Sequence, residues 1–210
     1  CKAMHESGIA PDFVTVDGGE GGTGAAPMEF SNHIGTPLVE GLIFVHNVLG
    51  GYDLRKKIKI ISSGKMTSGF GLVKRLALGS DICNSARAMM MALGCIQARK
   101  CNSNLCPVGV TTQNPSLFGA LVPEDKSQRV NNYHRNTVDS ACQIMGAMGL
   151  ESAEELRPWH LMRRIEAYEI RNFSEIYEYI ETGSLLNDSK PESYARACDA
   201  ARSDSFTATN

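Results

Sequence analysis

Strand-like and helix-like segments alternate over the first half of this chain, and this alternation limits the fold more than any other feature. The β-rich runs lie at 12–16, 58–62 and 80–84, and the helical segments that come after them lie at 37–49, 71–78 and 86–93. Strand–helix units of this length favour a parallel α/β sheet, open or closed into a barrel, with the first strand buried. An eight-stranded barrel takes about 250 residues, so three units would form only its tail.

Beyond residue 120 the alternation stops and helical spacing dominates. The segment 124–148 carries apolar residues at helical spacing, which places Cys142 on the core side of the helix. Shorter helices are expected at 150–155, 159–164 and 173–181, and the small, polar segment 191–210 is expected to fray. The chain therefore divides into residues 1–120, with the strand–helix units and a cysteine loop, and residues 121–210, a helical C-terminal extension.

Composition excludes several classes of protein. The seven cysteines are an odd number without regular spacing, unlike the disulfide framework of a small secreted domain. A formal net charge of −2 gives no basic field for nucleic acid, and no apolar run approaches the roughly 18–20 residues of a membrane span. We therefore expect a cytoplasmic protein with no nucleic-acid or membrane partner. The first four residues read as the middle of a helix, which predicts a truncated or processed chain.

Three of the cysteines fall in one polar loop. Cys95, Cys101 and Cys106 are separated by five and then four residues, and Pro107 follows the last. Cys101 and Cys106 flank asparagine and serine, so their thiols suit metal ligation better than core packing. Thiolates that converge select zinc or an iron–sulfur cluster. The spacing departs from a zinc knuckle, whereas a Cys-Pro ending also occurs in ferredoxin-type cluster loops. A cluster is therefore favoured over zinc and over structural thiols without a metal.

A glycine-rich loop, residues 18–27, follows the first strand. Glycine admits positive φ and lets backbone N–H groups approach a ligand closely, and parallel α/β folds bind ligands at the carboxyl ends of their strands. A dinucleotide fingerprint would lead straight into a helix, but the next helix is expected only at about Pro37. The loop indicates a ligand-binding segment, with a merely flexible loop as the alternative.

The second and third strands each end in a loop that suits a phosphate group. Residues 62–65 and 84–87 place small residues and backbone donors just before a helix N-terminus, which favours phosphate binding. In β/α barrels a phosphate often lies on the loops after the last two strands. Two successive loops of this kind indicate a phosphate site, with solvated side chains as the alternative for Lys65 and Arg87.

Five segments together resemble the FMN-binding synthase domain of glutamate synthases, in particular its stand-alone bacterial form. They are the loop at 18–27, Ser62-Ser63-Gly64-Lys65, Ala77-Leu78-Gly79-Ser80-Asp81, Ala92-Leu93-Gly94-Cys95 and the run 101–113. The resemblance extends from about residue 1 to residue 149. The cysteine segment, with its Cys-Pro-Val-Gly ending, is its most specific part.

The resemblance implies a fold, cofactors and a site. The α/β fold would be the C-terminal part of a (β/α)8 TIM-type barrel, followed by an α-helical C-terminal segment. The cofactors would be FMN and a [3Fe-4S] cluster, with the cluster held by Cys95, Cys101 and Cys106. The FMN phosphate would lie on Gly64, Lys65, Asn84, Ser85 and Ala86. The small-molecule 2-oxo acid would border the flavin at Gly21, Gly22, Thr23 and Gly24.

The resemblance also implies the chemistry, which is the reductive amination of 2-oxoglutarate to glutamate. Ammonia would condense to 2-iminoglutarate, reduced FMN would deliver a hydride, and the cluster would relay electrons to the flavin. The electrons would come from an electron donor protein or an NAD(P)H-oxidising subunit.

Two departures from the family pattern bear on these expectations. Asn84-Ser85 stands where typical members carry Gly-Thr, so the phosphate contacts would differ in detail. The first half of the barrel, with the catalytic residues that it would carry, and an amidotransferase domain are missing from the sequence. We therefore expect this chain to act with the missing N-terminal barrel half and to be inactive alone.

Two other functions are compatible with the sequence. One is a flavin and iron–sulfur oxidoreductase that acts on another 2-oxo acid or an imine. The other is a non-catalytic electron-transfer module whose cluster is structural. Assays with several oxo acids test the first, and an absence of flavin absorption from the full-length protein would favour the second.

Overall fold

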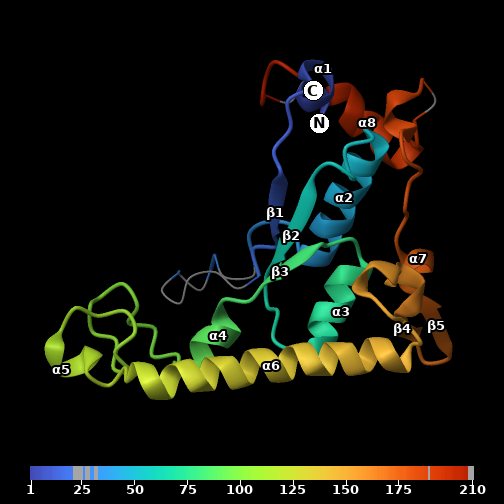
Figure 1. The fold of residues 1–210 in the computed structure, drawn as a ribbon. Helices are drawn as coiled ribbons and strands as arrows, with labels where there is room; N and C mark the ends of the chain where they lie inside the picture. Colours follow the sequence, from blue (N-terminus) through green and yellow to red (C-terminus); the bar gives the residue numbers. More distant parts are fainter. Residues whose placement is uncertain (21–25, 27–28, 31–32, 189, 208–210) are drawn as a thin grey trace.

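A computed structural model describes residues 1–20, 26, 29–30, 33–188 and 190–207 (Figure 1). The first half of the chain contains α1 (Lys2–Ser7), β1 (Phe13–Asp17), α2 (Leu38–Gly51), β2 (Lys59–Ser63), α3 (Gly69–Ala77), β3 (Ile82–Asn84) and α4 (Arg87–Ala92). The second half contains α5 (Pro115–Phe118), α6 (Pro123–Ala147), η1 (Ala153–Glu155), η2 (Pro158–His160), β4 (Met162–Glu166), β5 (Glu169–Asn172), α7 (Phe173–Ile176), η3 (Ser184–Leu186) and α8 (Glu192–Ala200), where η marks a 3-10 helix.

Strands β1, β2 and β3 form a parallel sheet in chain order. Their carboxyl ends are aligned, with Asp17 opposite Ser63 and Ser63 opposite Asn84. Helix α2 connects the first two strands and α3 connects the second pair, as parallel strands require. The predicted strand–helix alternation and the α/β class are thereby confirmed.

One face of this sheet carries the core. Helix α2 packs against β1 and β2, and α3 packs against β3. Leu42 on α2, Ile60 on β2 and Val73 on α3 are fully buried, and burial of one such side chain contributes about 1.5–3 kcal/mol. Residues from the C-terminal region, including Phe173 and Leu185, belong to the same core, so the two regions expected from the sequence pack together.

The opposite face of the sheet is open in the part of the chain that the structure describes. Phe13 on β1 and Ile82 on β3 are 55% and 51% exposed, and burial along β1 alternates residue by residue. The prediction that β1 is a buried strand is therefore wrong for this chain. A short apolar run looks the same whether or not another element covers its second face, so the sequence did not reveal this.

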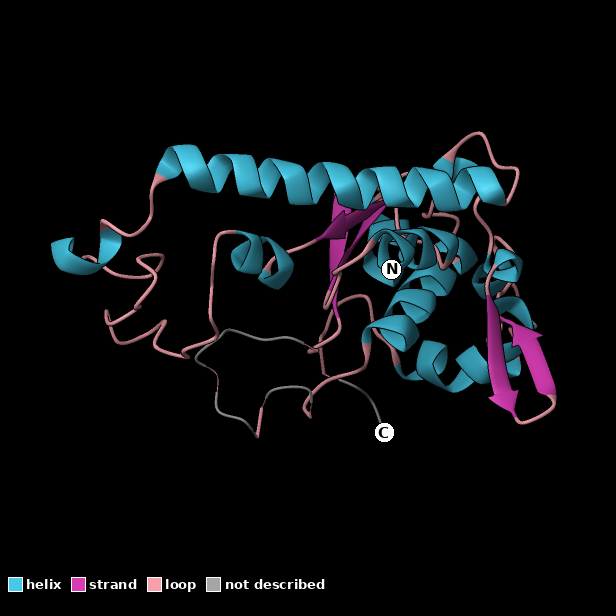
Figure 2. Cartoon of the chain, turned by 90° about the horizontal axis from the view of Figure 1, so that it is seen from below, coloured by secondary structure: helices cyan, strands magenta, loops and turns pink. Residues whose placement is uncertain are grey.

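Helix α6 confirms the helix predicted at 124–148. It runs across α3 and α4, along the bottom of Figure 1 and the top of Figure 2. Thr137 and Ala141, one turn apart, are its buried residues, and the hydroxyl of Tyr133 donates to the carbonyl oxygen of Thr67 at 2.8 Å. Cys142, predicted to lie in the core, is exposed. The prediction missed because the contact with α3 uses small side chains, which give a weak apolar signal.

The C-terminal region contains a hairpin where helices are predicted. Most of the segment 159–164 is η2 and β4, and β4 pairs antiparallel with β5, with Arg163 opposite Arg171. The helix predicted at 173–181 is only the single turn α7. Every residue of β4 is exposed, so no buried stripe marks its periodicity, and pairing with β5 decides its conformation.

The segment 191–210 does not fray over its first half. Helix α8 buries Tyr194 and Cys198, which lie one turn apart. The Nζ atom of Lys2 donates to the carbonyl oxygens of Cys198 and Ala201 at 2.5 and 2.8 Å, which ties α1 to the end of α8. None of the helices in the described ranges is both long and apolar enough to cross a membrane.

Candidate functional site

Three loops meet at the carboxyl edge of the sheet. The N–H of Gly18, after β1, donates to the carbonyl oxygen of Ser63 at 3.2 Å. The Asp17 carboxylate accepts the N–H of Gly19 at 3.0 Å and the Ser63 hydroxyl at 3.3 Å. The start of the glycine-rich loop is therefore tied to the end of β2. Asp17 is a site residue that the sequence reasoning did not single out, although its position at a strand end is visible in the sequence.

Gly18 lies directly against the start of α2. A Cβ atom at this position would lie 2.5 Å from the backbone nitrogen of Leu38, so only glycine fits. The residues expected to border the substrate, Gly21, Gly22, Thr23 and Gly24, lie outside the described residues. The structure thus places the start of this loop at the predicted edge.

The loop after β2 has an unusual backbone. Gly64 has φ +142° and Lys65 has φ +44°, both outside the conformations that side-chain-bearing residues prefer. The guanidinium of Arg75 donates to the carbonyl oxygen of Gly64, and the hydroxyl of Ser85, after β3, donates to the carbonyl oxygen of Met66 at 2.9 Å. The structure thereby brings the loops of Gly64 and Ser85 together.

The remaining phosphate-site residues lie at the end of β3. Asn84 ends β3 and is exposed, and Ala86 precedes the short helix α4. Lys65 is also exposed. The five residues predicted to hold the phosphate therefore come from two neighbouring loops at one edge of the sheet, where backbone N–H groups suit a phosphate.

A buried polar cluster lies behind these loops, and the sequence reasoning missed it. The hydroxyl of Ser62 donates to the sulfur of Cys83 at 3.3 Å, and the hydroxyl of Ser80 lies 3.0 Å from that of Ser62. Burial raises the pKa of the Cys83 thiol, and the hydrogen bonds from both serines and the charge of Arg75 oppose that rise. Ser62 inside a buried strand was the one sequence signal for this cluster.

The three loop cysteines have different environments. Cys95 is half-buried, Cys101 is exposed and Cys106 is buried. Within the ranges that the structure describes, no three side chains of histidine, cysteine, aspartate or glutamate are grouped so that they hold a metal ion. The structure therefore does not bring the three predicted ligands together.

The environment of Cys106 nevertheless suits a thiolate. Its pKa is lowered to about 7, chiefly because the backbone N–H of Thr111 donates to the sulfur, with further backbone N–H donors at Val108 and Val110; burial acts in the opposite direction. The hydroxyl oxygen of Thr111 is buried and has no hydrogen-bond partner among the described residues. Hydrogen bonds of this kind tune cluster sulfurs, so the chemistry of the donor set fits an iron–sulfur cluster.

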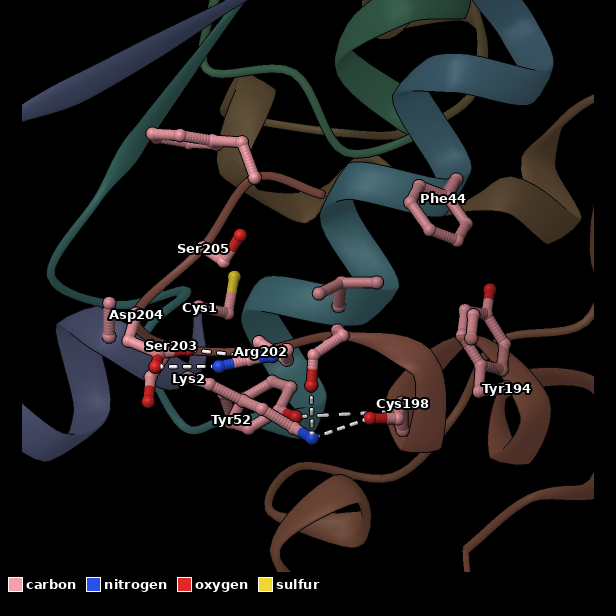
Figure 3. Close-up of a pocket in the computed structure, with 15 residues that line it drawn as sticks. Cys1, Lys2, Phe44, Tyr52, Tyr194, Cys198, Arg202, Ser203, Asp204 and Ser205 are labelled. Atoms are coloured by element: carbon pink, nitrogen blue, oxygen red, sulfur yellow. Dashed lines mark hydrogen bonds and ion pairs between the residues drawn. The ribbon is translucent and has the colours of Figure 1, made fainter. Parts of the chain in front are cut away.

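A cavity of about 410 Å³ lies at the opposite edge of the sheet, between α1, α2 and α8 (Figure 3). Its aromatic wall includes Tyr52 and Tyr194. The hydroxyl of Tyr52 lies 4.0 Å from the sulfur of Cys198, and burial raises the pKa of Tyr52 to about 12. Tyr194 accepts from Asn47, and Arg202 pairs with Asp204. Because these polar groups are paired within the chain, the cavity is a weaker candidate than the carboxyl edge.

Comparisons with known proteins bear on this site. Residues 2–151 match a family described as the conserved region in glutamate synthase. The chain is 39% identical over 173 residues to the glutamate synthase large subunit-like protein YerD of Bacillus subtilis, which covers 82% of this chain and 33% of that protein. It is 38% identical over 146 residues to an archaeal glutamate synthase (NADPH) of Methanocaldococcus jannaschii, which covers 70% of this chain and 29% of that protein. A solved flavocytochrome b2 variant with sulfite bound aligns with a TM-score of 0.45 at 17% identity, over 74% of this chain and 30% of that chain.

The chain belongs to the glutamate synthase family, because the match at 2–151 covers well over half of its residues. This confirms the family that the sequence motifs indicate. The chain spans about a third of the length of these two curated relatives.

Proposed function

We propose that this chain is the flavin- and cluster-binding part of a glutamate synthase-like oxidoreductase, which converts 2-oxoglutarate to glutamate by reductive amination. The observation that carries the proposal is the convergence of three strand-end loops at the carboxyl edge of a parallel sheet, in a chain of the glutamate synthase family. Parallel α/β folds place ligands at this edge.

FMN fits the loops after β2 and β3. Its phosphate would be held by the backbone of Gly64 and Lys65 and by the segment Asn84-Ser85-Ala86. The positive φ angles of Gly64 and Lys65 support this, since such backbone exposes N–H groups to an anion. The Ser85 hydroxyl already donates to Met66, so its backbone N–H is the group left to donate to the phosphate.

The 2-oxo acid would lie beside the flavin, on the open face of the sheet. Asp17, Ser63 and Asn84 form a row across that face at the carboxyl edge, and Gly21, Gly22, Thr23 and Gly24 would border the substrate. When bound, reduced FMN supplies the hydride that reduces the C=N bond of the imine, and the cluster supplies electrons. The Asp17 carboxylate positions the glycine-rich loop through the N–H of Gly19.

A [3Fe-4S] cluster would be held by Cys95, Cys101 and Cys106. Three thiolate ligands match a three-iron cluster, and the amide-rich surroundings of Cys106 favour its thiolate form. Because ligand groups often assemble only when the metal binds, we propose that Cys95 and Cys101 close on Cys106 as the cluster forms.

A further segment of polypeptide would complete the barrel. Phe13, Ile82 and the polar row at the carboxyl edge lie on a sheet face that no described element covers, and the matched part of this chain covers only 33% and 29% of the two relatives. We propose that a preceding barrel half covers this face and excludes water from the site. An electron donor protein or an NAD(P)H-oxidising subunit would reduce the enzyme.

The test is an anaerobic assay of the full-length protein with ammonia and 2-oxoglutarate, beside pyruvate and 2-oxobutyrate as alternative substrates. Absorption spectra of the same sample show whether flavin and cluster are bound. Glutamate formation that depends on both reactants supports the proposal. Faster turnover of another oxo acid would favour the broader oxidoreductase, and a protein without flavin would favour the electron-transfer module.

A further inference from the structure

The side chain of Arg75 links the loop after β2 to the helix that follows it. Arg75 lies on α3, and its Nη2 donates to the carbonyl oxygen of Gly64. Its Nη1 donates to the carbonyl oxygen of Gly71, one turn earlier on the same helix, at 2.8 Å. One guanidinium group therefore joins the rigid start of α3 to the backbone of the loop.

The bond to Gly64 sets the direction of the next amide. In a planar trans peptide, the C=O and the N–H point to opposite sides. Since the carbonyl group of Gly64 is turned toward Arg75, the N–H of Lys65, in the same peptide unit, points away from it. That N–H makes no hydrogen bond to another described residue. The positive φ angle of Lys65, +44°, is unfavourable for a residue with a side chain and persists only where surrounding structure holds it.

Arg75 is also incompletely satisfied. Its Nε atom is buried and has no hydrogen-bond partner among the described residues. Burial lowers the pKa of the guanidinium, while the Cys83 thiol and the Glu20 carboxylate act in the opposite direction. Burial of a donor without an acceptor is costly, and such groups call for an explanation in terms of function or strain. Arg75 thus contacts the loop after β2 and lies within electrostatic range of Cys83 on β3 and of Glu20 after β1.

We propose that Arg75 is a positioning residue for the phosphate of FMN, which acts by holding the Gly64–Lys65 loop so that the N–H of Lys65 faces the phosphate. The inference rests on the proposed function and explains how the backbone of its phosphate site is held in position. Arg75 works through the loop and makes no contact with the phosphate itself.

The test compares FMN with riboflavin, which lacks the phosphate, by fluorescence titration of the full-length apoprotein. Arg75→Met keeps much of the side-chain volume and removes the donors. We expect its dissociation constant for FMN to rise about tenfold to a hundredfold, and that for riboflavin to change less than about threefold. Arg75→Lys keeps the charge without the planar fork, so its effect is expected to be smaller. Lys74→Met is the matched control, because the Nζ atom of Lys74 lies 5.0 Å from the ring centroid of Phe173.

A folded Arg75→Met protein with the wild-type ratio of FMN to riboflavin affinity would overturn the proposal. Equal losses for both ligands would also overturn it, since they would show a general structural role. If thermal melts show that Arg75→Met does not fold, the Arg75→Lys protein decides by the same ratio. Wild-type protein that does not bind FMN would contradict the proposed function itself.

Discussion

The two edges of the parallel sheet differ in how completely their polar groups are paired. At the amino edge, the Asp81 carboxylate accepts from the guanidinium of Arg55 and the N–H of Ile60, at 2.8 and 2.7 Å. Arg55 also donates to the Nδ1 atom of His46 and to the carbonyl oxygen of Gly79, at 3.2 and 2.9 Å. The polar groups of this network are therefore paired with one another.

At the carboxyl edge, by comparison, polar groups are exposed or lack a hydrogen-bond partner. The Nε atom of Arg75 is buried without a partner among the described residues, and Asp17 and Asn84 are exposed. In parallel α/β folds, ligands bind at the carboxyl edge of the sheet. Unpaired polar groups concentrate where a ligand is expected, so the difference between the edges supports the proposed FMN site.

The largest expected effect is the loss of the cluster. Cys101→Ser should abolish cluster binding, because a hydroxyl is a poor iron ligand beside sulfide. Cys101 is exposed, so the substitution should leave the fold intact. Iron and sulfide analysis of anaerobically purified protein measures the effect. Cys142→Ser, at an exposed position on α6, is the control and should keep its iron. An unchanged iron content in the Cys101→Ser protein would contradict the proposed cluster.

The next effect concerns FMN at the carboxyl edge. Gly64→Val should weaken FMN binding tenfold to a hundredfold, or about 1.4–2.8 kcal/mol, because the side chain disturbs the close backbone approach to the phosphate. Fluorescence titration measures it. Gly149→Val is the matched control, because Gly149 also has a positive φ, +75°, and its Cβ would meet open space. Similar FMN affinities for the two variants would place the phosphate elsewhere.

A substitution at the amino edge should lower the stability of the protein and leave its FMN affinity unchanged. Asp81→Asn breaks an ion pair whose side chains are only 20% and 23% exposed, and should lower the free energy of unfolding by about 2 kcal/mol. Chemical denaturation measures this loss. FMN affinity of the folded variant should stay at the wild-type value. A loss of FMN affinity without a loss of stability would mean that the two edges are not separate in function.

The smallest effect is a pH dependence at the amino edge. Burial, followed by the charge of Arg55, lowers the pKa of His46 below its ordinary value of 6.5. The neutral form is therefore favoured in the folded state, and its contribution to stability is complete above pH 6.5 and decreases as the pH falls toward the folded-state pKa. His46→Gln should flatten this part of the stability curve, as denaturation at several pH values would show. An identical slope in both proteins would exclude His46 as the cause.

Features that depend on local pattern could be predicted from the sequence. Strand β2, helix α3 and the position of Gly64 at a strand end were all foreseeable, since each depends on apolar spacing or on turn residues. The hairpin at Arg163 was not, because its partner strand decides its conformation. Arg75 and Cys83 were missed for a related reason. Their roles depend on which loops meet in space, and a single arginine on an amphipathic helix gives no sign of that.

The central claim, that the carboxyl edge holds FMN, is tested most directly by measuring the FMN released when purified full-length protein is denatured. The measurement is made on the wild type and on one variant of each edge, Gly64→Val and Asp81→Asn. The account predicts stoichiometric FMN in the wild type and in Asp81→Asn, and a large deficit in Gly64→Val. Wild-type protein without flavin, or a Gly64→Val protein with its full complement, would contradict it.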